Sequence, residues 1–198
     1  MKKQKKSHTP QTPHTQPTTM PFDSQLATTL SLEPHPEGGF FRRTHENPRT
    51  VPNPFPDPSN PHDTVRLAST SIHYLLTPAS PIGHFHRNKA LTYHLHHRGR
   101  GRYRLIYDDG RVEEYVVGPD VENGEKIMWV VEGGVWKSSA LEPLEDGDDG
   151  EGLLISEVVV PGFDLRDHRF LDWSKLVELV GEEKAAEWRH FLKEGNRG

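Results

Sequence analysis

The sequence contains no cysteine among its 198 residues. Disulfide bonds, thiolate nucleophiles and cysteine-ligated zinc or iron–sulfur sites are therefore excluded, and any bound metal must take nitrogen and oxygen ligands. Hydrophobic residues supply only 32% of the chain, and no apolar run approaches the roughly 20 residues that span a bilayer. The sequence also lacks the apolar segment of a signal peptide, so we expect a cytoplasmic protein with no membrane partner.

Positive charge is scarce as well, because 24 Lys and Arg residues face 29 Asp and Glu residues and the net charge is −5. We therefore expect no nucleic-acid partner. Lysine is concentrated at Lys2, Lys3, Lys5 and Lys6. They lie within residues 1–21, which hold almost no apolar side chains and are expected to form a disordered tail. The lysines form either a solvated cluster or a nuclear localisation signal.

Residues 22–193 are expected to form a single domain, with residues 194–198 as a short tail. Between residues 67 and 160, short runs of β-branched and aromatic residues are separated by turns such as Asp109-Gly110, which is a strong hairpin signal. No helical pattern lies between these runs. The pattern predicts an antiparallel sandwich or barrel rather than a parallel α/β sheet.

Three further segments have a different composition. Residues 47–63 are rich in proline and are expected to form a long surface loop, and the acidic residues 142–152 a second loop. Residues 174–193 carry apolar side chains at helical spacing. They are expected to form one or two amphipathic helices on the outside of the barrel.

Histidine is concentrated in one stretch, since five of the 13 histidines lie between residues 83 and 97. Residues two apart in a strand share a face, so His84 and His86 are expected to point the same way. Two imidazoles on the inner face of a small barrel can hold a metal ion or exchange protons near pH 7. The strand register, and with it the position of His94, is left open by the sequence.

Several blocks of the chain, taken in order, resemble the cupin superfamily and in particular its DUF985 branch. They are "LEPHPEGGFFRRTH", "STSIHYLL", "GHFHRNK", "VVGPDVENGEKIMWVVEGGVWKSSAL" and "SEVVVPGFDLRDHRFLD". The resemblance implies an all-β fold with peripheral helices, namely the cupin double-stranded β-helix or RmlC-like jelly-roll barrel. It also implies a homodimer, which agrees with the open sheet edges of small jelly rolls.

The sequence departs from the metal-binding cupins at two ligand positions. Those proteins carry a glutamate four or five residues after the histidine pair, where this chain has Ala90 and Leu91. The last histidine of their second motif is replaced by Lys137, a poor ligand whose charge repels a cation. We therefore expect no firm metal cofactor, and the alternative is a divalent ion bound by His84, His86 and His94.

The predicted pocket combines imidazoles, one ammonium group and aromatic rings. The candidate catalytic residues are His84, His86 and Lys137. The candidate ligand-binding residues are His94, Tyr93, Tyr103, Trp129 and Glu37. For the histidines and the aromatic residues, packing in the core is the competing interpretation.

Three functions remain open at this point. The first is a module that binds a polar or anionic small molecule in the barrel cavity. The second is a metal-independent epimerase or isomerase, with His84 or His86 as base and Lys137 stabilising negative charge. The third is an enzyme that uses Fe, Mn or Zn.

Overall fold

The computed structural model describes residues 25–142 and 152–198. The predicted tail with its lysine cluster, and nearly all of the acidic loop, lie outside the described residues. No helix in these two ranges is long and apolar enough to cross a membrane.

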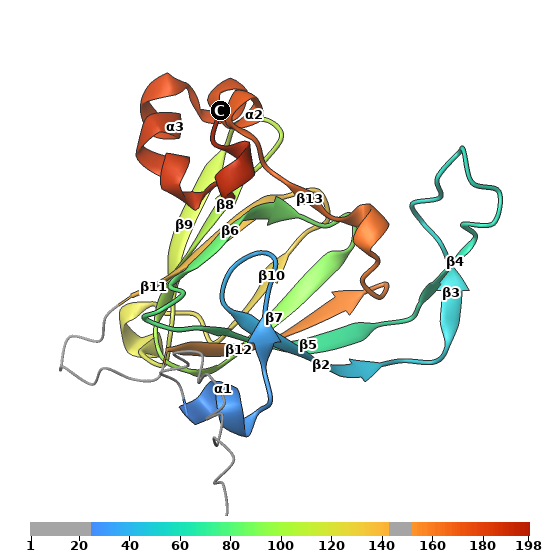
Figure 1. Cartoon of the computed structure of the whole chain (residues 1–198), viewed down its shortest axis with the longest axis horizontal. Coiled ribbons are helices and arrows are strands. Elements are labelled where there is room, and N and C mark those ends of the chain that lie inside the picture. Colours follow the sequence, from blue (N-terminus) through green and yellow to red (C-terminus); the bar gives the residue numbers. More distant parts are fainter. Residues whose placement is uncertain (1–24, 143–151) are drawn as a thin grey trace, which may run out of the picture.

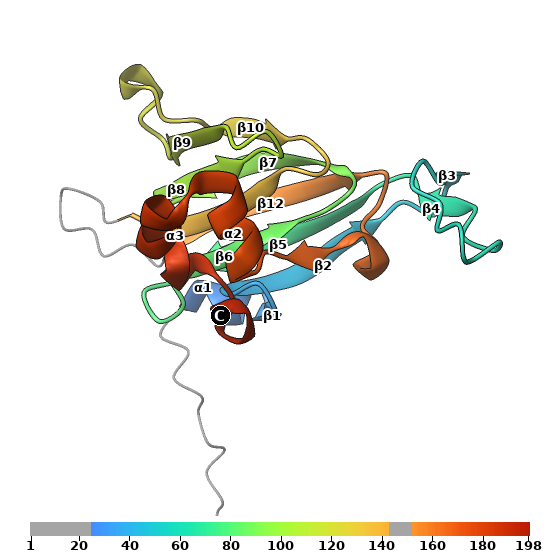
Figure 2. The ribbon, with the colours of Figure 1, turned by 90° about the horizontal axis from the view of Figure 1, so that it is seen from above.

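Two antiparallel sheets face each other, as Figures 1 and 2 show. The six-stranded sheet contains, in spatial order, β1 (Glu33–Pro34), β2 (Phe40–Glu46), β5 (Thr70–Leu76), β12 (Leu153–Val160), β7 (Leu91–Arg98) and β10 (Met128–Val131). The five-stranded sheet contains β13 (Arg169–Phe170), β6 (Ile82–Arg87), β11 (Trp136–Leu141), β8 (Gly101–Ile106) and β9 (Val112–Val117). Strands distant in sequence alternate within each sheet, so the predicted all-β jelly roll with peripheral helices is confirmed.

The core lies between the two sheets and follows from the alternation of inward and outward residues along each strand. Its buried members include Tyr74 of β5, Leu105 of β8 and Ile155 of β12. The predicted hairpin at Asp109-Gly110 joins β8 to β9, and Gly110 adopts a positive φ of 83° there. A side chain at that position would be strained, which explains the glycine.

The C-terminal helices cover the outer face of the five-stranded sheet (Figure 1). They are α2 (Trp173–Val180) and α3 (Glu182–Trp188), and Asp172 caps the first through its side chain. Trp188 packs on Phe85 of β6 with ring centroids 5.7 Å apart. At the opposite end of the molecule, the short helix α1 (Gln25–Thr29) packs through Ala27 against Leu75 of β5.

The proline-rich segment forms an arm that projects from the sandwich (Figure 1). It was expected to be a loop, but three of its residues form β3 (Thr50–Pro52), which pairs with β4 (Val65–Leu67) in a two-stranded ribbon. Proline is tolerated here because the ribbon has free edges that need no backbone donor.

Candidate functional site

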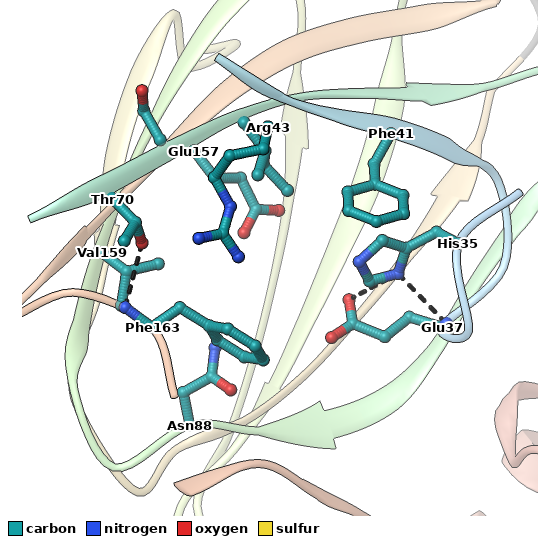
Figure 3. Close-up of a pocket in the computed structure, with 11 residues that line it drawn as sticks. His35, Glu37, Phe41, Arg43, Thr70, Asn88, Glu157, Val159 and Phe163 are labelled. Atoms are coloured by element: carbon teal, nitrogen blue, oxygen red, sulfur yellow. Dashed lines mark hydrogen bonds and ion pairs between the residues drawn. The ribbon is translucent and has the colours of Figure 1, made fainter. Parts of the chain in front are cut away.

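A small pocket, partly open to solvent, lies at the inner side of β2, β5 and β12 (Figure 3). It is lined by His35, Glu37, Phe41, Arg43, Thr70, Ser71, Ile72, Asn88, Glu157, Val159 and Phe163. The lining joins two aromatic rings, one guanidinium group and two carboxylates. Such a mixture of apolar walls and a few convergent polar groups is typical of small-molecule sites.

Glu37 lies in the turn between β1 and β2 and is buried. The turn approaches β6 so closely that a Cβ atom on Gly38 would lie 2.1 Å from the carbonyl oxygen of Ile82. Only glycine fits at that position, which also has a φ of 98°. Glu37 therefore lines the pocket, where the sequence placed it as a candidate ligand-binding residue.

The predicted common face of His84 and His86 is wrong. β6 pairs Lys137 with His86 and Ser139 with Gly83, so one extra residue of β6 lies between the two pairs. This β-bulge interrupts the alternation of side chains. His86 points into the barrel, whereas His84 lies against the C-terminal segment, near Phe191 and Arg197. His84 is therefore not part of the cavity.

The backbone of His84 nevertheless supports the site. Its N–H donates to the carbonyl oxygen of Glu37 at 2.6 Å, and its carbonyl oxygen accepts from Nδ1 of His86 at 2.8 Å. The bulge thus fixes both the turn that carries Glu37 and the orientation of the His86 ring. Bulges commonly redirect side chains next to functional sites in this way.

Three side chains meet at the Glu37 carboxylate. Nε2 of His86 lies 3.2 Å from Oε2, Nε2 of His168 donates to Oε1 at 2.8 Å, and Nδ1 of His35 lies 3.6 Å from Oε2. The rings of His86 and His168 are stacked with centroids 5.4 Å apart. One ligand atom from each of Glu37, His86 and His168 lies within 4.8 Å of the others, so these three residues could hold a metal ion.

The protonation of this cluster follows from burial and from its neighbours. Burial alone would raise the pKa of Glu37, but His86, the hydrogen bond from His168 and the charge of Lys137 hold it below its usual range. Burial lowers the pKa of His86 to about 3; the Glu37 carboxylate opposes this shift, and the charge of Lys137 adds to it. Burial also lowers the pKa of His35. A carboxylate at Glu37 and neutral rings at His35 and His86 are therefore the forms present near pH 7.

Lys137 lies inside the barrel, as predicted, and is almost fully buried. It donates to Nε2 of His94 at 2.9 Å and to Oε2 of Glu157 at 3.0 Å. The structure thus brings His86, His94 and Lys137 into one interior. His94 does not join His84 in a ligand set, because His84 lies on the other side of the sheet.

The three predicted aromatic residues divide between the two faces. Trp129 stacks on His94 at 5.1 Å, and Tyr103 meets Trp129 edge-on at 4.7 Å. Both are core residues behind the pocket rather than part of its wall. Tyr93 precedes His94 on β7 and faces outward, with 37% of its surface exposed, so its expected place in the cavity is wrong.

Sequence reasoning missed His35, His168 and Glu157. His168 reaches the site because β13 pairs with β6, where Phe170 lies opposite His86. This contact spans more than 80 residues and leaves no local pattern. His35 and Glu37 are separated by one residue in "PHPEGG", and this spacing in a glycine-rich turn was the available signal.

Comparison with known proteins gives consistent matches. A family model described as "Cupin superfamily (DUF985)" matches residues 24–171. The uncharacterized protein YML079W of Saccharomyces cerevisiae is 49% identical over 167 residues, which is 82% of each chain.

Two solved structures are also similar. A hypothetical protein from Leishmania major has a TM-score of 0.66 and 31% identity, covering 77% of this chain and 89% of its own. Protein SO0799 from Shewanella oneidensis has a TM-score of 0.66 and 25% identity, covering 84% of this chain and 94% of its own.

Proposed function

The chain belongs to the DUF985 family of the cupin superfamily, and from this premise we propose that it binds a small polar or anionic metabolite in the pocket beside Glu37. The observation that carries the proposal is a pair of hydrogen-bond donors, His35 and Arg43, directed into one pocket from opposite sides (Figure 3).

The first donor follows from the tautomer of His35. Its Nδ1 accepts from the backbone N–H of Glu37 at 3.1 Å, so in the neutral ring the proton is on Nε2. Figure 3 shows this second nitrogen directed into the pocket. Nε2–H can therefore donate to an oxygen atom of a bound molecule.

The second donor is Arg43 of β2, whose guanidinium group points into the pocket on the side of Glu157 and Phe163 (Figure 3). Nη1 of Arg43 also contacts Glu46 on the same strand. The other guanidinium N–H groups can then donate to a ligand. Guanidinium groups bind carboxylate and phosphate oxygens in pairs. Two donors on opposite sides favour an anionic group between them.

The remaining lining suggests what else the ligand carries. Oδ1 of Asn88 is buried and has no hydrogen-bond partner within the described ranges, so it would accept from a hydroxyl or amine. Phe41 and Phe163 supply apolar walls. We infer a compact hydroxylated or aminated acid as the ligand class.

A thermal-shift screen of small hydroxy acids, amino acids and phosphate monoesters, followed by calorimetry on each hit, tests the proposal. Arg43→Gln should weaken binding by roughly 10- to 100-fold, because hydrogen bonds to charged groups contribute about 1.5–3 kcal/mol. Arg42→Gln is the matched control, since Arg42 is exposed and reaches the carbonyl oxygen of Leu30 instead. Equal effects of the two substitutions, or no hit in the screen, would contradict a binding function for this pocket.

The second candidate function is acid–base catalysis of an epimerase or isomerase type in the same cavity. It is favoured by the contact of one carboxylate with three imidazoles and by Lys137 close behind Glu157. Groups with such different proton affinities can donate and remove protons in one site. Each ligand found in the screen is therefore assayed for conversion. Stabilisation without conversion favours binding, whereas conversion that a folded Lys137→Met variant loses favours the enzyme.

A further inference from the structure

We propose that Glu37, His86 and His168 bind a divalent transition-metal ion, at a position different from the histidine pair that the sequence pattern indicates. The ion would lie at the edge of the ligand pocket, because Glu37 also lines that pocket. The inference goes beyond metabolite binding and does not depend on it.

The donor set has the composition of known metal sites. Two imidazole nitrogens and one carboxylate oxygen lie within 4.8 Å of one another, and no other group of three such residues converges in the parts of the chain that the structure describes. Two histidines and one carboxylate bind zinc and non-haem iron in proteins and leave further coordination positions open. The carboxylate charge offsets part of the charge of the ion.

The tautomer of His86 supports the same site. A carbonyl oxygen only accepts, so Nδ1 of His86, which lies 2.8 Å from the His84 carbonyl oxygen, must carry the proton. Nε2 of the neutral ring then presents a lone pair toward Oε2 of Glu37, 3.2 Å away. Two acceptors thus face each other in the interior, and Nε2 has no hydrogen-bond partner among the described residues. A cation between them removes the conflict.

The hydrogen bonds that orient the proposed ligands are also typical of metal sites. Histidines that bind metals usually donate their other N–H to a carbonyl oxygen or a carboxylate, which fixes the ring. His86 does so through the bulge of β6. A substitution at Gly38 would disturb the turn that holds the Glu37 carboxylate, because that turn lies directly on the Ile82 carbonyl.

A proton on Nε2 of His86 is the competing explanation. The geometry opposes it, because Nε2 lies 3.2 Å from Oε2 of Glu37 and still forms no hydrogen bond within the described ranges. Lys137 would also repel a metal ion, but its ammonium group is paired with the Glu157 carboxylate at 3.0 Å. The paired charge is largely neutralised, so it opposes a divalent ion less than a free lysine would.

The surface of the protein offers a useful internal control. His73 and His97 have ring centroids 5.9 Å apart, and both bond to the hydroxyl oxygen of Ser156. This pair of a half-buried and an exposed histidine can bind metal ions adventitiously. Loss of His97 should therefore leave the interior site unchanged.

The experiment uses the full chain without an affinity tag, stripped with chelator and then titrated with Co²⁺ and with Zn²⁺. We expect one ion per chain by elemental analysis after gel filtration, a visible Co²⁺ absorption band, and an increase in the thermal midpoint. His168→Gln and Glu37→Gln should each weaken binding by at least about tenfold, the lower end of the effect of losing even an indirect support. His97→Gln should bind like the parent protein.

Circular dichroism checks that each variant is folded. NMR of the parent protein shows which histidine rings lie near the bound Co²⁺. Paramagnetic Co²⁺ should broaden the ring signals of His86 and His168 before those of His73. Broadening confined to His73 and His97, loss of the ion in His97→Gln alone, or a doubly protonated His86 ring at pH 7 would overturn the proposal. A chain that binds no metabolite and still binds Co²⁺ at these residues would contradict the proposed function and leave the metal site intact.

Discussion

Lys137 has 3% of its surface exposed, and its ammonium group lies between an imidazole and a carboxylate. The ammonium only donates, so Nε2 of His94 accepts and its proton is on Nδ1. Burial and the adjacent Lys137 charge lower the pKa of His94 well below its usual value. The His94 ring therefore remains neutral and holds the lysine in place.

This arrangement predicts a strong coupling between Lys137 and Glu157. Lys137→Met should destabilise the protein by about 3–5 kcal/mol, because it leaves an unpaired carboxylate in the interior. The double variant Lys137→Met/Glu157→Gln should recover most of that loss. The free energy of unfolding in urea measures both effects. Lys89→Met is the control, since Lys89 is half-exposed in its ion pair with Asp167, and such pairs contribute about 1 kcal/mol or less.

Additive losses in this cycle would mean that Lys137 and Glu157 do not act as a pair. A loss in Lys137→Met no larger than that of Lys89→Met would contradict the buried position of the ammonium group.

At the scale of elements, the β6 strand explains why the site was only partly predictable. In a regular strand, residues two apart share a face, and this rule predicts that His84 and His86 both point inward. A single inserted residue in β6 breaks the rule and moves His84 out of the barrel. A bulge of this kind has no reliable signature in one sequence. The inward position of Tyr93 was a different error. Tyr93 and His94 were both ligand-binding candidates, but adjacent residues of one strand point to opposite faces, and the structure turns His94 inward.

A buried ion-pair cluster fastens the arm formed by β3 and β4 to the sandwich. Arg66 of β4 is buried between Asp63 and Asp167, with Nε 3.1 Å from Oδ2 of Asp167. Asp167 immediately precedes His168, so the arm and one of the proposed metal ligands share an anchor.

Replacing Arg66 by Gln should therefore loosen both segments. We expect amide exchange in residues 50–67 and 165–168 to become faster by about tenfold or more, since a loss of about 1.4 kcal/mol of local stability raises the open population tenfold. Exchange in the central strands β5 and β12 should stay slow. Arg49→Gln, an exposed substitution on the same arm, is the control, and equal exchange rates in both variants would refute the anchoring role.

At the scale of the whole molecule, the fold was predictable because it depends on patterns repeated along the chain. Short β-rich runs, the Asp109-Gly110 turn and the apolar spacing of residues 174–193 each recur in the structure as strands, a hairpin and helices. The pairing of β13 with β6 has no such repetition. Fold class therefore follows from local sequence, whereas the meeting of Glu37, His86 and His168 follows from long-range topology.

The outer surface of the six-stranded sheet carries an apolar patch at the β10 edge. Figure 2 shows strand β10 beside β7. Met128 lies opposite Leu95 and Val130 lies opposite Tyr93, so these four exposed side chains form one continuous surface. We call this surface the β7–β10 patch. An apolar surface next to an unpaired strand edge tends to associate with another chain.

We expect a second copy of the chain to cover the β7–β10 patch in a two-fold dimer, in which the same surface contributes from both subunits. Leu95→Glu should then shift the protein to a monomer, because it introduces two charges into an apolar interface without altering the core. Sedimentation equilibrium at micromolar concentration measures this shift. Leu165→Glu changes a more exposed leucine that lies outside β7 and β10, and it should leave the dimer intact. A parent protein that sediments as a monomer, or a Leu95→Glu variant that remains a dimer, would exclude this surface as the interface.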